Sequence, residues 1–171
     1  MDVKITLNGK MITDSVDADM VLLDFCRKHN CYSVKRGCES GNCGLLDGKP
    51  ILSCSTPVGR ANGRRVDTLE GLQEEAKAFT RFFAAQGADQ CGFCNPGYIV
   101  NIVALLRENP DPTDEEILEY LSGNLCRCTG YQSQLRSLRN YLNSKKEGAA
   151  MDLEANVYGE DVGKEWKHEG I

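Results

Sequence analysis

Two pairs of closely spaced cysteines constrain this chain more than any other feature. One pair is the C-x-x-C of Cys91 and Cys94, and the other is the C-x-C of Cys126 and Cys128. The gap between the pairs is long enough for two short helices. Four thiolates on two tight turns can surround one compact inorganic centre, and such a Cys₄ set suits zinc or an iron–sulfur cluster.

The spacing and the predicted helix ends favour iron and sulfide over zinc. Zinc usually uses two C-x-x-C knuckles, whereas a C-x-C arm makes a tighter bite. Both arms precede predicted helices, whose free N–H groups and positive dipole ends favour an anion. A thiolate-ligated [2Fe–2S] cluster is such an anion, and donors near its sulfurs help set its potential. Structural zinc and ordinary core cysteines remain the alternatives.

Cys38, Cys43 and Cys54 form a second, less regular set. Cys38 and Cys43 fit the start of the plant-type ferredoxin pattern C-x₄-C-x₂-C with a distant fourth cysteine, for which Cys54 is a candidate. The pattern calls for its third cysteine three residues after Cys43, where the chain has Leu46. A second cluster is therefore predicted from an incomplete set of ligands.

Composition restricts the classes of function. The formal net charge of −5 argues against nucleic-acid binding. No apolar run approaches the roughly 20 residues of a membrane helix, and no secretory signal pattern is visible at the N-terminus, so we expect a cytoplasmic protein without membrane insertion. In that reducing compartment, nine cysteines are more typical of metal ligands than of disulfides.

Alternating apolar residues and turn dipeptides predict a small α+β unit in the first 70 residues. Asn8-Gly9 is a strong hairpin signal. Asp19 is predicted to cap a helix whose apolar face includes Cys26, as a buried structural thiol. Residues 37–44 are expected to form a loop. Strands are predicted at 3–7, 11–16, 51–54 and 64–67.

From Thr68 onward the pattern predicts four helices. The first stops at Gly87, and the second has Asn95 as its cap and Pro96 in its first turn. Thr113 to Glu116 read as a capping box for the third. The fourth is marked by Tyr131, Leu135, Leu138 and Leu142 at helical spacing.

Five motifs between residues 3 and 142 are together far more specific than any one of them. They are Val34-Lys35-Arg36-Gly37-Cys38, Asp47-Gly48-Lys49-Pro50, Thr68-Leu69-Glu70-Gly71, Gln90-Cys91-Gly92-Phe93-Cys94-Asn95-Pro96-Gly97 and Gly123-Asn124-Leu125-Cys126-Arg127-Cys128-Thr129-Gly130-Tyr131. With these motifs the chain resembles the small iron–sulfur subunit of the molybdenum hydroxylases, the xanthine dehydrogenase and aldehyde oxidase family.

The resemblance implies a fold and a set of ligands. It implies a β-grasp ferredoxin-like domain at residues 1–70, a four-helix domain at 71–146, and an extension at 147–171 that is disordered or docks on a partner subunit. Two [2Fe–2S] clusters are implied. The cluster nearest the molybdenum cofactor would be ligated by Cys91, Cys94, Cys126 and Cys128, and the second by Cys38, Cys43 and Cys54.

The loop after Cys43 departs from the family. The family reads Cys-Gly-x-Cys-Thr and an apolar stretch before Asp-Gly-Lys-Pro, whereas here Cys43-Gly44-Leu45-Leu46 leads directly into Asp47-Gly48. About four residues, including the third ligand, are missing. Three interpretations remain open: the natural chain has residues that this sequence lacks, Cys31 supplies the fourth thiolate, or the cluster is absent or has a non-cysteine ligand.

The implied function is electron transfer within a larger oxidoreductase. Gln90 and Cys128 would contact the pterin, and the second cluster would pass electrons to a flavin. Molybdopterin would be bound by a large partner subunit and FAD by another, because this chain is short and has no G-x-G-x-x-G signal. A xanthine or purine dehydrogenase is the expected context, with nicotinate- or aldehyde-oxidising relatives as alternatives. A zinc-stapled interaction module and a free-standing ferredoxin are the alternatives from other classes.

Overall fold

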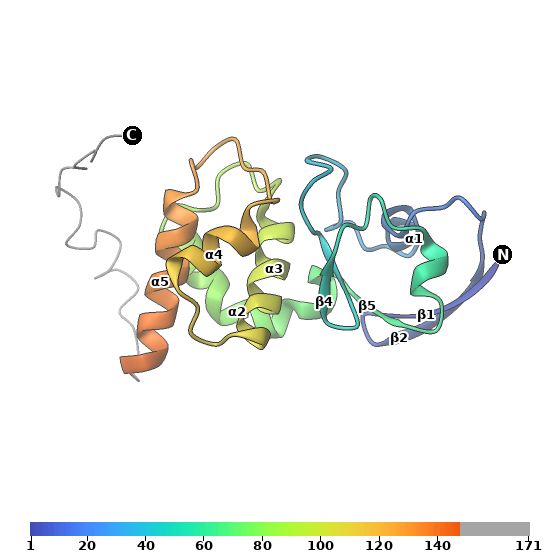
Figure 1. The fold of residues 1–171 in the computed structure, drawn as a ribbon, viewed down its shortest axis with the longest axis horizontal. Helices are drawn as coiled ribbons and strands as arrows, with labels where there is room; N and C mark the ends of the chain where they lie inside the picture. Colours follow the sequence, from blue (N-terminus) through green and yellow to red (C-terminus); the bar gives the residue numbers. More distant parts are fainter. Residues whose placement is uncertain (148–171) are drawn as a thin grey trace.

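The computed structural model describes residues 1–147, in which a mixed β-sheet is followed by four helices (Figure 1). The sheet has the strand order β2-β1-β5-β3-β4, in which β1 and β5 are parallel and the other neighbours antiparallel. Its strands are β1 (Asp2–Leu7), β2 (Lys10–Ser15), β3 (Gly44–Leu46), β4 (Lys49–Ile51) and β5 (Arg65–Asp67). The predicted α+β class is confirmed.

Two tight hairpins shape this sheet. Asn8 and Gly9 both have positive φ angles, of 50° and 79°, as a two-residue turn between twisted strands requires. Asp47 and Gly48 form the second such turn, with φ angles of 49° and 83°. Along β1, every second side chain is buried, so one face of the sheet supplies a core. Helix α1 (Leu22–Lys28) and a 3₁₀ turn (Val58–Ala61) pack onto this core.

Three local predictions for this half are corrected. The strand expected at 51–54 is β4, which ends at Ile51, and the segment expected to be loop up to residue 44 passes into β3 at Gly44. Asp19 does not cap α1, because the N-cap position is Val21 and no side chain caps that end.

Two further residues of this half fit their positions. Strand β4 can contain Pro50 because it is an edge strand of the sheet. Cys26 is fully buried, as predicted.

The second half consists of α2 (Leu69–Ala85), α3 (Asn95–Glu108), α4 (Asp114–Leu121) and α5 (Gln132–Glu147). Thr113 and Glu116 form the predicted capping box at the start of α4. Pro96 lies in the first turn of α3, but the N-cap is Cys94 rather than the predicted Asn95. One of the cysteines that define the chain thus lies directly at the start of a helix.

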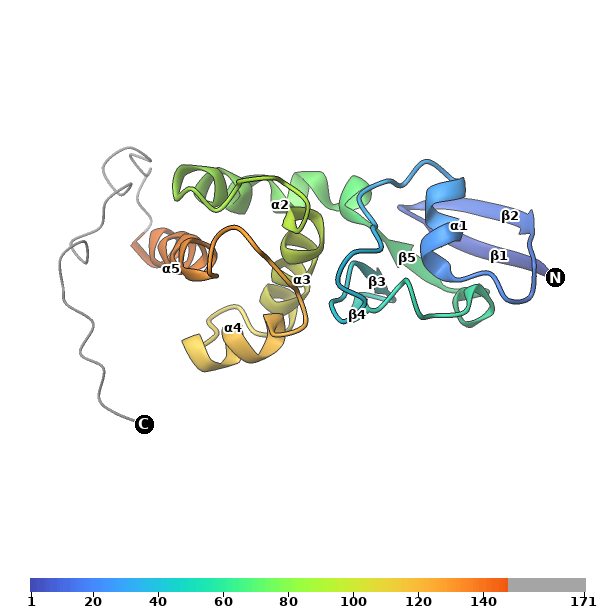
Figure 2. The ribbon, with the colours of Figure 1, turned by 90° about the horizontal axis from the view of Figure 1, so that it is seen from above.

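Helix α3 joins the two halves of the molecule. It lies between the sheet and the other helices, next to β3 and β4 (Figure 2). Leu45 of β3 is fully buried in the hydrophobic core of the helices, whereas the adjacent Leu46 packs into the core of the sheet. Strand β3 therefore contributes to both cores. The domain boundary at residue 70 stays a prediction, although α2 begins at Leu69.

The predicted extension at 147–171 lies outside the described part of the chain, apart from Glu147 at the end of α5. Among residues 1–147, no helix has the length and apolar character needed to cross a membrane.

Candidate metal centre

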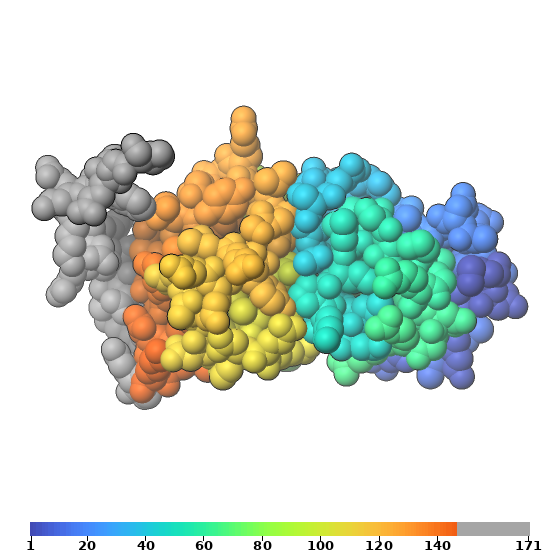
Figure 3. All heavy atoms as spheres, in the orientation of Figure 1, coloured from blue at the N-terminus to red at the C-terminus, as the bar shows by residue number. Residues whose placement is uncertain are grey.

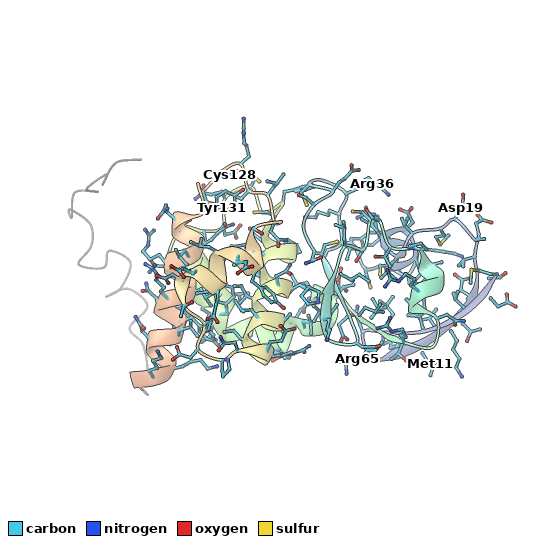
Figure 4. All side chains as sticks on the ribbon, in the orientation of Figure 1. Met11, Asp19, Arg36, Arg65, Cys128 and Tyr131 are labelled. Carbon is cyan, nitrogen blue, oxygen red and sulfur yellow. The ribbon has the colours of Figure 1, made fainter. Side chains whose placement is uncertain are left out.

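A cavity of about 570 Å³ lies where three loops meet at one edge of the molecule. The loops precede β3, α3 and α5. Figure 4 places Cys128 and Tyr131 at the same edge as Arg36, which lies just before the first of these loops. Six of the seven predicted site cysteines line the cavity: Cys38, Cys43, Cys91, Cys94, Cys126 and Cys128.

The four cysteines of the helical half are arranged as two pairs, and each pair combines one residue from each motif. The Cys128 thiol lies 3.6 Å from the sulfur of Cys91 and donates to it. The Cys94 thiol in turn hydrogen-bonds to Cys126. The two sequence motifs, separated by α3 and α4, are thus brought together sulfur to sulfur.

This pairing bears on the kind of metal that fits. A single zinc ion would need all four sulfurs about 3.8 Å apart, because Zn–S bonds are about 2.3 Å long and tetrahedral. Within residues 1–147, no three cysteine, histidine or carboxylate side chains converge on one ion position. The structure instead has two separate pairs of neighbouring thiols. Two such pairs match the four thiolates that ligate a two-iron cluster. The donor set therefore fits a [2Fe–2S] cluster, with one pair of thiols for each iron.

Local backbone structure explains how the pairs are held. Gly92 has a φ of +77°, which allows the tight turn between Cys91 and Cys94. In the other loop, the N–H of Cys126 donates to the Tyr131 hydroxyl at 3.0 Å, and the N–H of Tyr131 donates to Thr129 Oγ1 at 3.1 Å. Helix α5 begins at Gln132, so Cys126 and Cys128 lie in a structured turn ahead of it.

Cys91 and Cys128 form an exposed outer pair. The N–H of Phe93, followed by the Cys128 thiol, lowers the pKa of Cys91. The pKa of Cys128 is raised because its thiol donates to Cys91. One sulfur of this pair is thus predisposed to be the thiolate, which is the form that binds metal.

Cys94 and Cys126 form a more enclosed inner pair. Burial, together with the neighbouring Cys126, raises the pKa of Cys94 to about 12. Burial also opposes ionisation of Cys126, but hydrogen bonds from the Thr129 hydroxyl and from the N–H groups of Cys128 and Thr129 outweigh it and lower the pKa. The Thr129 Oγ1 lies 3.2 Å from Cys126 Sγ.

Gln90 lies beside the cavity, and its side chain does not enter it. Its amide Nε2 donates to the carbonyl of Gly87 at 2.9 Å on the exposed surface. Its predicted contact with a pterin stays a prediction.

The N-terminal set is only partly assembled. Cys38 and Cys43 line the cavity, whereas Cys54 is buried outside it, 6% exposed. Burial opposes ionisation of Cys38, but the N–H groups of Ser40, Gly41 and Leu125 outweigh it and lower its pKa. Burial raises the pKa of Cys43.

These residues do not complete a four-thiolate site. Leu46, at the position expected for the third ligand, is 5% exposed and packs in the core of the sheet. Cys31 does not line the cavity, and its sulfur accepts a hydrogen bond from Asn8 Nδ2 at 3.2 Å. The described residues thus offer three thiols for the N-terminal site, and we assign no step to a cluster there.

The loop from Cys38 to Cys43 is fastened to the helical half. Asn101 and Asn124 both donate to the carbonyl of Asn42, at 2.8 and 3.0 Å, and Ser40 Oγ donates to the carbonyl of Gly123 at 3.1 Å. In Figure 3 the light-blue surface of this loop meets the orange surface of the segment before α5. The two sets of thiols are therefore held against one another by hydrogen bonds.

Comparison with known proteins agrees with this geometry. Residues 68–139 match the family model of a [2Fe–2S] binding domain. The chain is 43% identical to the nicotinate dehydrogenase small FeS subunit of Eubacterium barkeri over 136 residues, which are 75% of this chain and 87% of the relative. The chain belongs to the small [2Fe–2S] subunits of the molybdenum hydroxylases.

Further relatives of this small subunit carry different names. It is 40% identical to a probable xanthine dehydrogenase subunit of Bacillus subtilis (strain 168), covering 82% of this chain and 86% of the relative. It matches the crystal structure of quinoline 2-oxidoreductase from Pseudomonas putida 86 with a TM-score of 0.76 and 36% identity, over 86% of this chain and 97% of the matched one. It is an iron–sulfur electron-transfer subunit of a molybdenum hydroxylase, as the motifs predicted.

Several residues that shape the site were not anticipated from the sequence. Asn101 and Asn124 fasten the N-terminal loop, Thr129 donates to Cys126, and Gln134 donates from its Nε2 to Cys94 Sγ at 3.7 Å. The position of Gln134 was detectable, because it stands four residues before Leu138 on the predicted apolar face of α5. A glutamine on such a face indicates a buried polar partner.

Proposed function

We propose that Cys91, Cys94, Cys126 and Cys128 hold a [2Fe–2S] cluster that receives electrons from a molybdopterin site on a large partner subunit. The observation that supports this most directly is the arrangement of the four thiols as two pairs. When bound, such a cluster takes up and gives back single electrons. The chain itself supplies the thiolates and their hydrogen-bond donors, and in this proposal the substrate is converted on the partner subunit.

The exposed outer pair faces the proposed molybdopterin subunit. Cys91 and Cys128 are exposed, and the side chain of Gln90, next to Cys91, is also on the surface. A pterin on the partner would therefore meet Cys128 and Gln90 first. In this proposal their role is to bring the electron donor close and to orient it.

The onward electron acceptor is proposed to be FAD on another subunit. The predicted route through a second [2Fe–2S] cluster at Cys38, Cys43 and Cys54 stays a prediction, because the described residues provide three thiols there. Iron analysis distinguishes the possibilities, with two irons per chain for one cluster and four for two.

We propose a nitrogen heterocycle as the substrate of the complex. The three relatives described above, each at least 36% identical, are named for nicotinate, xanthine and quinoline, which all contain ring nitrogen. Relatives named for aldehydes also match, at 35% identity or less. A purine substrate, predicted from the sequence, and a nicotinate-type substrate both agree with this class. The choice between them depends on the large subunit.

Purification of the native complex through a tag on this chain tests the proposal. We expect this chain to elute in gel filtration with larger chains that carry molybdenum and FAD. The complex should reduce a dye acceptor with xanthine or nicotinate, and less with simple aldehydes. Elution of the chain alone, without molybdenum or flavin, would contradict the assignment to a complex, and a preference for aldehydes would contradict the substrate class.

A further inference from the structure

Gln134 is a polar side chain in a fully buried position on the first turn of α5. Gln134 is 0% exposed, and its side chain contacts Cys94 of the inner thiol pair. The amide Nε2 donates to Cys94 Sγ at 3.7 Å. The amide oxygen Oε1 has no hydrogen-bond partner within the described part of the chain.

This arrangement is unfavourable for folding taken alone. A buried amide oxygen without a partner loses its hydration and gains nothing in return, so native proteins rarely keep one without a reason. Leu138, one turn further along α5, is equally buried and apolar. An aliphatic residue at position 134 would continue that apolar face, so core packing does not account for the glutamine.

The contact that accounts for it is the one with Cys94. When a thiolate-bound cluster is reduced, negative charge increases on its sulfurs. A fixed N–H donor stabilises the added charge, and more strongly where burial lowers the local dielectric. The donor lies on a helix, so its position relative to the sulfur is fixed by the core.

We propose that Gln134 sets the reduction potential of the cluster held by the four thiols, by donating a hydrogen bond to the sulfur of Cys94. This inference rests on the proposed function. Gln134 acts on the cluster through Cys94, so it is a positioning residue and not a catalytic one. Removing the donor should make the cluster harder to reduce.

The test is a redox titration of the intact complex, followed by low-temperature EPR. In Gln134→Met, a side chain of similar length without a donor replaces the amide. The equilibrium constant for one-electron reduction should fall about tenfold, which corresponds to a midpoint lower by about 59 mV. Iron content and the thermal unfolding midpoint of the complex are measured in parallel.

A second variant and a matched control make the result specific. Gln134→Glu keeps the shape of the side chain and replaces the N–H donor by an oxygen, so it should also lower the midpoint. Ser137→Ala removes another fully buried polar group from the same helix, whose hydroxyl donates to the Gln134 carbonyl at 2.6 Å rather than to a sulfur. The midpoint of this control should stay at the wild-type value.

The outcomes separate this inference from the proposed function. A wild-type complex without a [2Fe–2S] EPR signal would overturn both. A wild-type signal whose midpoint is unchanged in Gln134→Met and Gln134→Glu would overturn this inference alone. An equal shift in Ser137→Ala would also overturn it, because the effect would then follow from packing of α5.

Discussion

The sulfur of Cys128 lies 3.6 Å from the sulfur of Cys91, although the two residues are 37 positions apart in the sequence. Helices α3 and α4 lie between the two cysteines in the sequence, and together they bring the chain back to the position of Cys91. Any metal held by this pair therefore closes a loop around two helices. Metal binding and folding of the helical half should consequently be coupled.

The first prediction concerns this coupling. Cys91→Ala and Cys128→Ala should each lose the iron bound by the helical half and lower the thermal unfolding midpoint, because each leaves one iron with a single thiolate. Iron analysis and calorimetry measure both effects. Cys26→Ala is the control, because the Cys26 thiol is fully buried outside the cavity. This variant should keep the iron content of the wild-type protein. Full iron content in Cys128→Ala would refute the pairing.

The second prediction concerns the fastening of the N-terminal loop. Asn101 is fully buried and donates to the carbonyls of Asn42 and Gly97, at 2.8 and 2.7 Å. Asn101→Ala should lower the free energy of unfolding by about 1–3 kcal/mol, because two carbonyls lose a donor. Urea denaturation measures this change in the free energy of unfolding. Asn109→Ala, which removes two exposed hydrogen bonds, one to Glu116 and one from the N–H of Asp111, should cost no more than about 0.5 kcal/mol. Equal losses of unfolding free energy in the two variants would show that the buried hydrogen bonds of Asn101 do not stabilise this contact.

The third prediction uses the close approach of two backbones. A Cβ added at Gly41 would lie 2.5 Å from the carbonyl oxygen of Gly123, which belongs to the backbone and cannot move easily. Gly41→Ala should cost about 1–3 kcal/mol and make Cys38 react faster with a thiol reagent. Gly59→Ala is the control, because a Cβ there meets only the flexible end of Met1. An unchanged reaction rate in Gly41→Ala would show that the contact does not hold the loop.

The fourth prediction is a pH dependence. Burial opposes ionisation of Glu70, but donors from Ser33 and Thr68 outweigh it and hold its pKa below the usual 4.5. Because the folded-state pKa is the lower one, the carboxylate stabilises the fold above pH 4.5 and this contribution is lost as the pH falls through the folded-state value. In Glu70→Gln, the free energy of unfolding should therefore fall less steeply as the pH is lowered below 4.5 than it does in the wild type, as measured by urea unfolding. An equally steep fall in both proteins would contradict this role of Glu70.

Much of the fold could be predicted because its signals are local. Asn8-Gly9 and Asp47-Gly48 adopt the positive φ angles that their residue types favour, and the capping box at Thr113 starts α4. Strand β3 was not predicted, because a strand of three residues carries too little periodicity. Leu45 and Leu46 also face different cores, a relationship that depends on how β3 lies between the sheet and α3.

The candidate site could be predicted only as a list of thiols. The cysteine motifs named the four thiols that the structure brings to one cavity, but not which of them lie side by side. The structure pairs Cys91 with Cys128 and Cys94 with Cys126. This cross-pairing depends on how α3 and α4 fold back. The hydrogen bonds of Asn101 and Gln134 depend in the same way on tertiary packing, which no local pattern encodes.

The most direct test of the central claim is the metal content of the native protein, with iron, zinc and acid-labile sulfide determined on one sample. The two thiol pairs predict iron and sulfide in equal amounts, at least two of each per chain, and a [2Fe–2S] EPR signal after reduction that is absent in Cys126→Ala. One zinc per chain without labile sulfide would contradict the account.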